Sequence, residues 1–131
     1  MNHFSPVDGV GTRAMLVRAR EPFRREGARG VRITLQVPRD LLHFIGHFPG
    51  DPILPAIAQL ELIVLDEIAL CWPELGSPCE LQRLKWKAPI RPGDELQLEL
   101  VRNGAKPRVD FAIVRGSDAC GQGVILFEAA L

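Results

Sequence analysis

GHFPGDPILPAIAQLE, residues 46–61, is the stretch of this 131-residue sequence that decides the fold. Glycines and prolines crowd its first half, which forbids a continuous helix or a ladder strand there. Pro55 suits the first position of a helix, where its missing N–H would have no partner anyway. The stretch therefore predicts a shaped loop that leads directly into a helix.

The helix that follows is expected over residues 55–72, where the most apolar run of the chain lies, and Pro73 ends the pattern. Four polar residues interrupt this run, too many for a membrane-spanning segment: Gln59, Glu61, Asp66 and Glu67. We interpret Asp66 and Glu67 as solvated or capping groups. The helix should be packed inside a globular protein.

Strand patterns lie on both sides of the helix. Residues 12–20 and 30–38 are the first candidates, and in the second of these apolar and polar residues alternate from Val31 to Val37. Four further strand-like runs follow the helix, with turns at Pro92-Gly93 and Asn103-Gly104, and the last covers about 121–130. Alternation is clearest in two of these runs, at Leu96, Leu98 and Leu100 and at Val109, Phe111 and Ile113.

This order of elements predicts an α+β fold in which an antiparallel sheet of about five to six strands wraps one long central helix. The chain has room for one core, so we expect a single domain over residues 1–131, with 1–11 as a loose N-terminal segment.

Composition excludes several classes of protein. Sixteen basic residues balance sixteen acidic ones, so total charge indicates neither a nucleic-acid partner nor a membrane surface. Three cysteines, Cys71, Cys79 and Cys120, form no CxxC pair and are expected as free thiols in a reducing compartment. The N-terminus lacks the pattern of an export signal, which makes the cytoplasm the expected location.

The loop before the helix carries the first candidate for chemistry, the imidazole of His47. A helix start offers unpaired backbone N–H groups and a partial positive charge, here at Ala56 or Ile57. Such donors stabilise oxygen anions that form during acyl transfer or elimination. The second candidate is Glu61, which lies among apolar neighbours in the sequence.

Burial among apolar side chains would raise the pKa of Glu61 and let it donate a proton near neutral pH. Taken alone, however, a histidine in a loop is more often structural than catalytic, and the same holds for one glutamate in a helix. The residue types by themselves leave both roles open.

Two stretches together resemble the beta-hydroxyacyl-acyl-carrier-protein dehydratases, a family with the hotdog fold. The first is residues 46–61, and the second is RLKWKAPIRPGDELQLEL at 83–100. In that family the motif histidine is the base and an acid fourteen positions later is its partner, which implies His47 and Glu61. Ala56 stands where the family usually has the glycine whose N–H binds the thioester carbonyl, and Phe48, Pro55 and Ile57 would complete the substrate site.

The resemblance implies a lyase that reversibly converts a 3-hydroxyacyl thioester on acyl carrier protein to the trans-2-enoyl thioester. The pair Gln59-Leu60, just before Glu61, resembles the same stretch of shorter dehydratase-like proteins of specialised acyl or polyene pathways. No cofactor and no metal is implied, and His43, four residues before His47, lacks the helix that a metal pair at this spacing requires.

The partners implied are an acyl carrier protein with its phosphopantetheine arm and a second copy of the chain, as a homodimer or higher homo-oligomer. In the family the histidine of one subunit meets the acid of the other. The arginine-rich first third of the chain would favour an acidic carrier, although it equally suits a solvated hairpin.

Two other functions stay open. A hotdog acyl thioesterase would use Glu61 as a base or nucleophile, and a non-catalytic acyl-binding subunit would keep the fold alone. The sequence does not distinguish a fatty acid pathway from a polyene pathway, or carrier protein from coenzyme A. It also does not give the length of the acyl chain.

Overall fold

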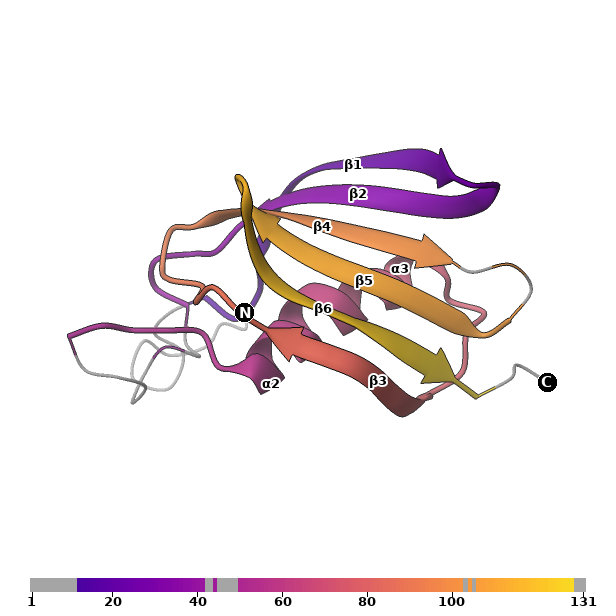
Figure 1. The fold of residues 1–131 in the computed structure, drawn as a ribbon. Helices are drawn as coiled ribbons and strands as arrows, with labels where there is room; N and C mark the ends of the chain where they lie inside the picture. The colour runs from indigo at the N-terminus through magenta and orange to yellow at the C-terminus, as the bar shows by residue number, and fades with distance from the viewer. Residues whose placement is uncertain (1–11, 42–43, 45–49, 103, 105, 129–131) are drawn as a thin grey trace, which may run out of the picture.

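The computed structural model describes residues 12–41, 44, 50–102, 104 and 106–128. Six strands form one antiparallel sheet, and their order across it is β1-β2-β4-β5-β6-β3 (Figure 1). The strands are β1 (Leu16–Arg25), β2 (Ala28–Gln36), β3 (Pro78–Trp86), β4 (Glu95–Arg102), β5 (Arg108–Arg115) and β6 (Asp118–Phe127). This confirms the predicted α+β class and the order of two strands, a helix and four strands.

The helix is continuous from Ala56 to Cys71 and has three parts, α2 (Ala56–Ala58), η2 (Gln59–Leu65) and α3 (Asp66–Cys71). The middle part is a π-helix, in which the Asp66 N–H donates to the Glu61 carbonyl five residues before it. Pro55 has extended geometry (φ −63°, ψ 153°), so it precedes the helix and is not its first residue. Nothing in the residue pattern signals the π-helix.

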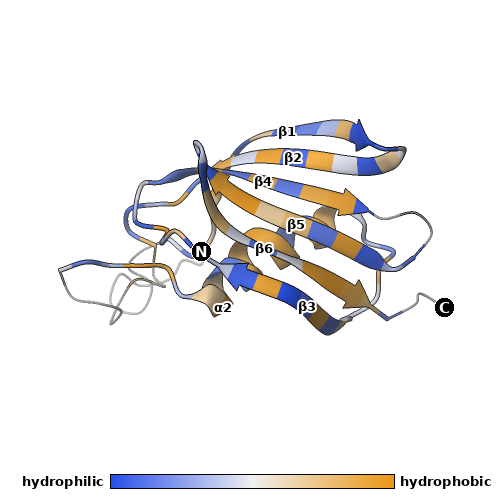
Figure 2. Ribbon diagram, viewed as in Figure 1, coloured by the Kyte–Doolittle hydropathy of each residue, from blue (hydrophilic) through white to orange (hydrophobic). Residues whose placement is uncertain are grey.

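The core lies between the helix and the inner face of the sheet. Figure 2 shows hydrophobic and hydrophilic residues alternating along β4 and β5. The side chains that the alternation predicted to face the core are buried on both strands: Leu96, Leu98 and Leu100 on β4, and Val109, Phe111 and Ile113 on β5. On β2, Ile33 and Leu35 are buried, as the alternation predicted. The helix side chains Ile63, Val64 and Ile68, each at most 2% exposed, fill the space opposite.

Strand boundaries differ from the prediction at the first hairpin. β1 ends at Arg25, five residues later than expected, because Glu26 (φ 52°) and Gly27 (φ 83°) form the turn. Two residues with positive φ give a turn whose twist matches an antiparallel hairpin. Glu26 is not a typical residue for this conformation, so the turn could not be placed from composition.

Glu67 differs from its predicted role, because it is buried and not solvated. Its two carboxylate oxygens accept hydrogen bonds of 2.7 and 3.0 Å from the Arg20 guanidinium. Since Arg20 lies on β1, this ion pair links one edge strand of the sheet to the helix. The three cysteines are free, as expected. In the described part of the chain, no helix is both long and apolar enough to span a membrane.

Candidate functional site

The structure brings part of the predicted site together at the start of the helix. Pro55 is the residue before the helix, Ala56 and Ile57 begin it, and Glu61 follows in the π-helical part. His47, Phe48 and His43 lie outside the described residues. Their predicted roles therefore stay predictions.

Glu61 is exposed on the single chain, so the expectation that its own chain would bury it is wrong. Its sequence neighbours Leu60, Ile63 and Val64 are buried because they point toward the sheet. Glu61 points to the side of the helix that the sheet does not cover. Apolar neighbours in a helix sequence do not surround a side chain, because they are spread around the axis.

The uncovered side of the helix includes Ile57, Glu61, Leu65 and Ala69, which we call the exposed helix face. These residues are spaced four apart and therefore lie on one side of the helix. Ile57 is 64% exposed and Leu65 is half-buried. A carboxylate on this face is available to whatever covers the helix.

A second acid, Asp66, lies directly after the π-helical part. Partial burial raises the pKa of Asp66, and the charges of Glu67 and Glu61 raise it further. The carboxylates of Glu61 and Glu67 thus act on Asp66. A positively charged group would be favoured beside Asp66.

The helix start is built to donate hydrogen bonds. The N–H groups of a first helical turn have no acceptor within the helix, and Pro55 at the N-cap provides no side-chain cap. Ala56 and Ile57 are both exposed. Their predicted role as donors to a carbonyl oxygen stays a prediction.

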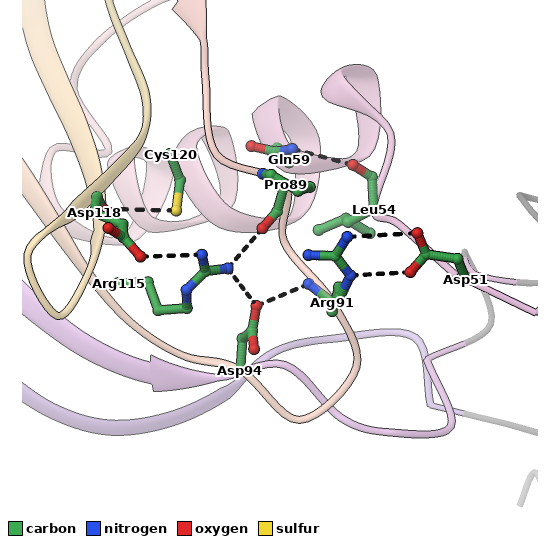
Figure 3. A network of polar contacts seen from close by, with 9 residues as sticks. All are labelled: Asp51, Leu54, Gln59, Pro89, Arg91, Asp94, Arg115, Asp118 and Cys120. Atoms are coloured by element: carbon green, nitrogen blue, oxygen red, sulfur yellow. Dashed lines mark hydrogen bonds and ion pairs between the residues drawn. The ribbon is translucent and has the colours of Figure 1, made fainter.

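Two hydrogen bonds hold the segment that leads into the helix, and Figure 3 shows the one between Gln59 and Leu54. The Leu54 N–H donates to the Ile90 carbonyl at 2.8 Å, and the Gln59 side-chain amide donates to the Leu54 carbonyl at 3.0 Å. Gln59 is buried, and its Oε1 atom has no hydrogen-bond partner among the described residues. The start of the helix is thus fixed against the segment before β4.

Ion pairs extend this support, and sequence reasoning missed them. Arg91 pairs with Asp51, and Arg115 donates to both Asp94 and the Pro89 carbonyl, as Figure 3 shows. The sequence carries many possible Arg–Asp pairs, and only the fold selects these ones.

An apolar hollow of about 360 Å³ lies beside the second half of the helix. The helix contributes Leu65, Ile68 and Ala69, Trp72 directly follows it, and Pro78 and Phe127 come from the sheet. Leu65 and Ala69 also belong to the exposed helix face. Apolar space therefore continues along the helix from the position of Glu61.

Some of the charges of the first hairpin are compensated. Arg25 and Arg32 both pair with Glu99, and Arg20 pairs with Glu67. The surface formed by the first third of the sequence is therefore less basic than its number of arginines indicates. Among the described residues, no group of three His, Cys, Asp or Glu side chains lies together as a metal site would require.

A six-stranded antiparallel sheet that wraps one long helix is the hotdog fold, and solved structures share it. An uncharacterized protein from Erwinia carotovora subsp. atroseptica has a TM-score of 0.73 and 27% identity, covering 88% of this chain and 96% of that one. The dehydratase heterocomplex ApeI:P from Xenorhabdus doucetiae has a TM-score of 0.73 and 26% identity, covering 86% and 96%.

The model of the ApeI-like family, described as ApeI dehydratase, matches residues 24–124, and the chain belongs to this family. The curated relatives include 3-hydroxyacyl-[acyl-carrier-protein] dehydratase FabZ of Thermomicrobium roseum, 33% identical over 98 residues, or 64% of this chain and 62% of that protein. FabZ of Haemophilus influenzae (strain PittEE) is 32% identical over 88 residues, or 59% and 60%. The chain spans about three fifths of the length of these two relatives.

Proposed function

We propose that this protein dehydrates a 3-hydroxyacyl thioester carried by acyl carrier protein, with Glu61 as the acid and His47 as the base. The observation that carries the proposal is the position of Glu61, a carboxyl group on an otherwise apolar helix face, one turn beyond a helix start whose first N–H groups have no acceptor within the helix. The family match includes both residues.

The chemistry assigns one role to each group. The His47 imidazole takes a proton from the carbon next to the thioester carbonyl, and the electrons form the new double bond as the 3-hydroxyl departs. Glu61 gives its proton to that hydroxyl, which leaves as water. The N–H of Ala56 or Ile57 donates to the carbonyl oxygen while negative charge develops there.

The exposure of Glu61 leads to the second part of the proposal, that another hotdog chain covers the exposed helix face. A carboxylic acid holds its proton near neutral pH when water is excluded from it, and this chain alone does not exclude water from Glu61. Ile57, which is 64% exposed on this face, supplies apolar surface for such a contact.

We take the covering chain to be a second copy, so that the active form is a homodimer or a higher homo-oligomer. The ApeI:P structure from Xenorhabdus doucetiae is a heterocomplex, which makes a different hotdog subunit the alternative partner. Sedimentation of the purified protein separates the two, because only the homo-oligomer forms from this chain alone.

The apolar hollow beside the helix is an argument for an acyl substrate, because Leu65 and Ala69 both line the hollow and belong to the exposed helix face. A chain attached at the thioester near Ala56 would pass Glu61 and lie against Leu65 and Ala69. The pathway, fatty acid or polyene, depends on what this space accepts.

Mass spectrometry of carrier-bound substrates tests the proposal. Wild type is incubated with 3-hydroxyacyl and 2-enoyl thioesters of different lengths, and the loss or gain of one water is followed together with free thiol. We expect interconversion without thiol release, and a fall of about 100- to 10,000-fold for His47→Ala and for Glu61→Gln. Thiol release without enoyl product would instead identify a thioesterase, and no reaction would leave an acyl-binding subunit.

A further inference from the structure

Segment 50–55 is the connection between the predicted base and the helix that carries the predicted acid. Gly50 has a φ of 87°, a left-handed conformation that glycine adopts without strain, and the chain turns there. Asp51 follows this turn and lies four residues after His47 in the sequence. Whatever fixes Asp51 fixes the point at which the loop joins the described fold.

Arg91 holds Asp51 in a two-point contact. Its Nε and one terminal nitrogen donate to the two carboxylate oxygens at 3.0 and 3.4 Å (Figure 3). A planar guanidinium that meets both oxygens fixes orientation as well as distance. The hydrogen bond lowers the pKa of Asp51 below its usual value, so the carboxylate is charged at neutral pH.

Arg91 is itself held by a rigid support. Its backbone N–H donates to Asp94 at 2.8 Å, and Asp94 also accepts a hydrogen bond from Arg115 at 3.0 Å. Arg115 comes from β5 and donates to the Pro89 carbonyl as well. The backbone that carries Arg91 is therefore tied to the sheet, and only its side chain reaches the loop.

We propose that Arg91 is a positioning residue for the proposed dehydration, which sets the loop containing His47 relative to Glu61 through its ion pair with Asp51. This inference rests on the proposed function. Reacting groups must be placed within a fraction of an ångström, and a small displacement of one of them lowers the rate of the chemical step.

The size of the effect follows from exposure. The side chains of Arg91 and Asp51 are 44% and 62% exposed, and exposed ion pairs are weak and screened by salt. We expect Arg91→Ala to lower kcat by about two- to five-fold with little change in KM. Because the backbone N–H that binds Asp94 remains, the variant should keep its fold and melting temperature.

A double-mutant cycle tests the pairing. Arg91→Ala, Asp51→Ala and the double variant are assayed with a 3-hydroxyacyl N-acetylcysteamine thioester, which removes the charge of the carrier protein from the measurement. The proposal predicts that the double variant is no slower than either single one, that Arg91→Lys restores part of kcat, and that added salt slows the wild type but not Arg91→Ala.

Arg108→Ala is the matched control, since it removes another two-point Arg–Asp pair, with Asp110, that lies within β5. Its kcat should equal that of the wild type. Equal kcat for Arg91→Ala and wild type, or independent effects of Arg91→Ala and Asp51→Ala, would overturn the positioning role and leave the dehydratase proposal intact.

Hydrogen exchange provides a readout that does not require activity. We expect the amides of segment 50–55 to exchange faster in Arg91→Ala and in Asp51→Ala, and to be unchanged in Arg108→Ala. Unchanged exchange in the first two variants would show that the pair fixes nothing. If the wild type has no dehydratase activity, the proposed function is wrong and the positioning role falls with it. This holds even if hydrogen exchange shows that the Arg91–Asp51 pair fixes segment 50–55.

Discussion

At the scale of single residues, close packing between β3 and β6 depends on glycine. A Cβ atom on Gly121 would lie 2.6 Å from the Trp86 ring, and one on Gly123 would lie 2.5 Å from Leu84. Both distances are shorter than real contacts allow. These two glycines let side chains of the edge strand β3 lie across β6.

Gly121→Ala should therefore destabilise the protein. The added methyl group must displace Trp86, which is held against Phe111 with ring centroids 6.1 Å apart, and overpacking of this kind costs about 1–3 kcal/mol. Urea denaturation measures the change. Gln122→Ala, at an exposed neighbouring position, should leave the midpoint nearly unchanged, and equal effects of the two variants would contradict the packing argument.

Asp66 gives a prediction for pH. Its folded-state pKa is raised by partial burial, Glu67 and Glu61, so the folded state binds more protons than the unfolded state just above the ordinary aspartate pKa of about 3.9. The contribution of Asp66 to stability therefore falls as pH rises through the raised pKa. Asp66→Asn should be more stable than wild type at pH 7, and this advantage should shrink at lower pH. An advantage that grows on acidification would contradict the sign of the shift.

At the scale of elements, the sequence predicted the order of strands and helix well and the environment of Glu61 poorly. Alternation along β2, β4 and β5 reports directly which side chains face the core, because each strand has one buried face. The helix has no such clear signal, since Glu61 and Glu67 lie in the same apolar run and yet one is exposed and the other buried. The difference depends on Arg20, which comes from a distant strand.

The Arg20–Glu67 pair should be important for the attachment of β1 to the helix. Arg20→Ala leaves a buried carboxylate without its partner, and we expect a loss of about 1–3 kcal/mol, less than for a fully buried pair because Arg20 is 45% exposed. The double variant Arg20→Ala/Glu67→Met should recover part of this loss. A double variant less stable than Arg20→Ala, measured by urea denaturation, would contradict a desolvation penalty at Glu67.

At the scale of the whole molecule, the described residues cover the helix that carries Glu61 on the side that faces the sheet. The sheet buries Ile63 and Val64, while Ile57, Glu61 and Ala69 stay exposed. The sequence placed Glu61 in the helix, where it lies, but a single sequence does not show which helix face remains free. The proposed assembly follows from that free face.

Association should be sensitive to charge on the exposed helix face. Ala69→Glu adds a carboxylate there without removing any buried side chain, and it should shift the protein from dimer toward monomer in sedimentation velocity. Gln122→Glu adds the same charge on the sheet and should sediment like the wild type. Loss of association in both variants would point to general charge repulsion instead of a specific contact.

Mixing of two inactive variants tests the central claim most directly. His47→Ala and Glu61→Gln are purified separately, mixed under conditions that exchange subunits, and assayed for loss of water from a 3-hydroxyacyl thioester. If the base of one subunit works with the acid of the other, half of the molecules are mixed dimers with one intact site, and activity should return to about a quarter of the wild-type value. A mixture that exchanges subunits and stays inactive, while the wild type dehydrates the substrate, would contradict a site shared by His47 and Glu61 across the dimer.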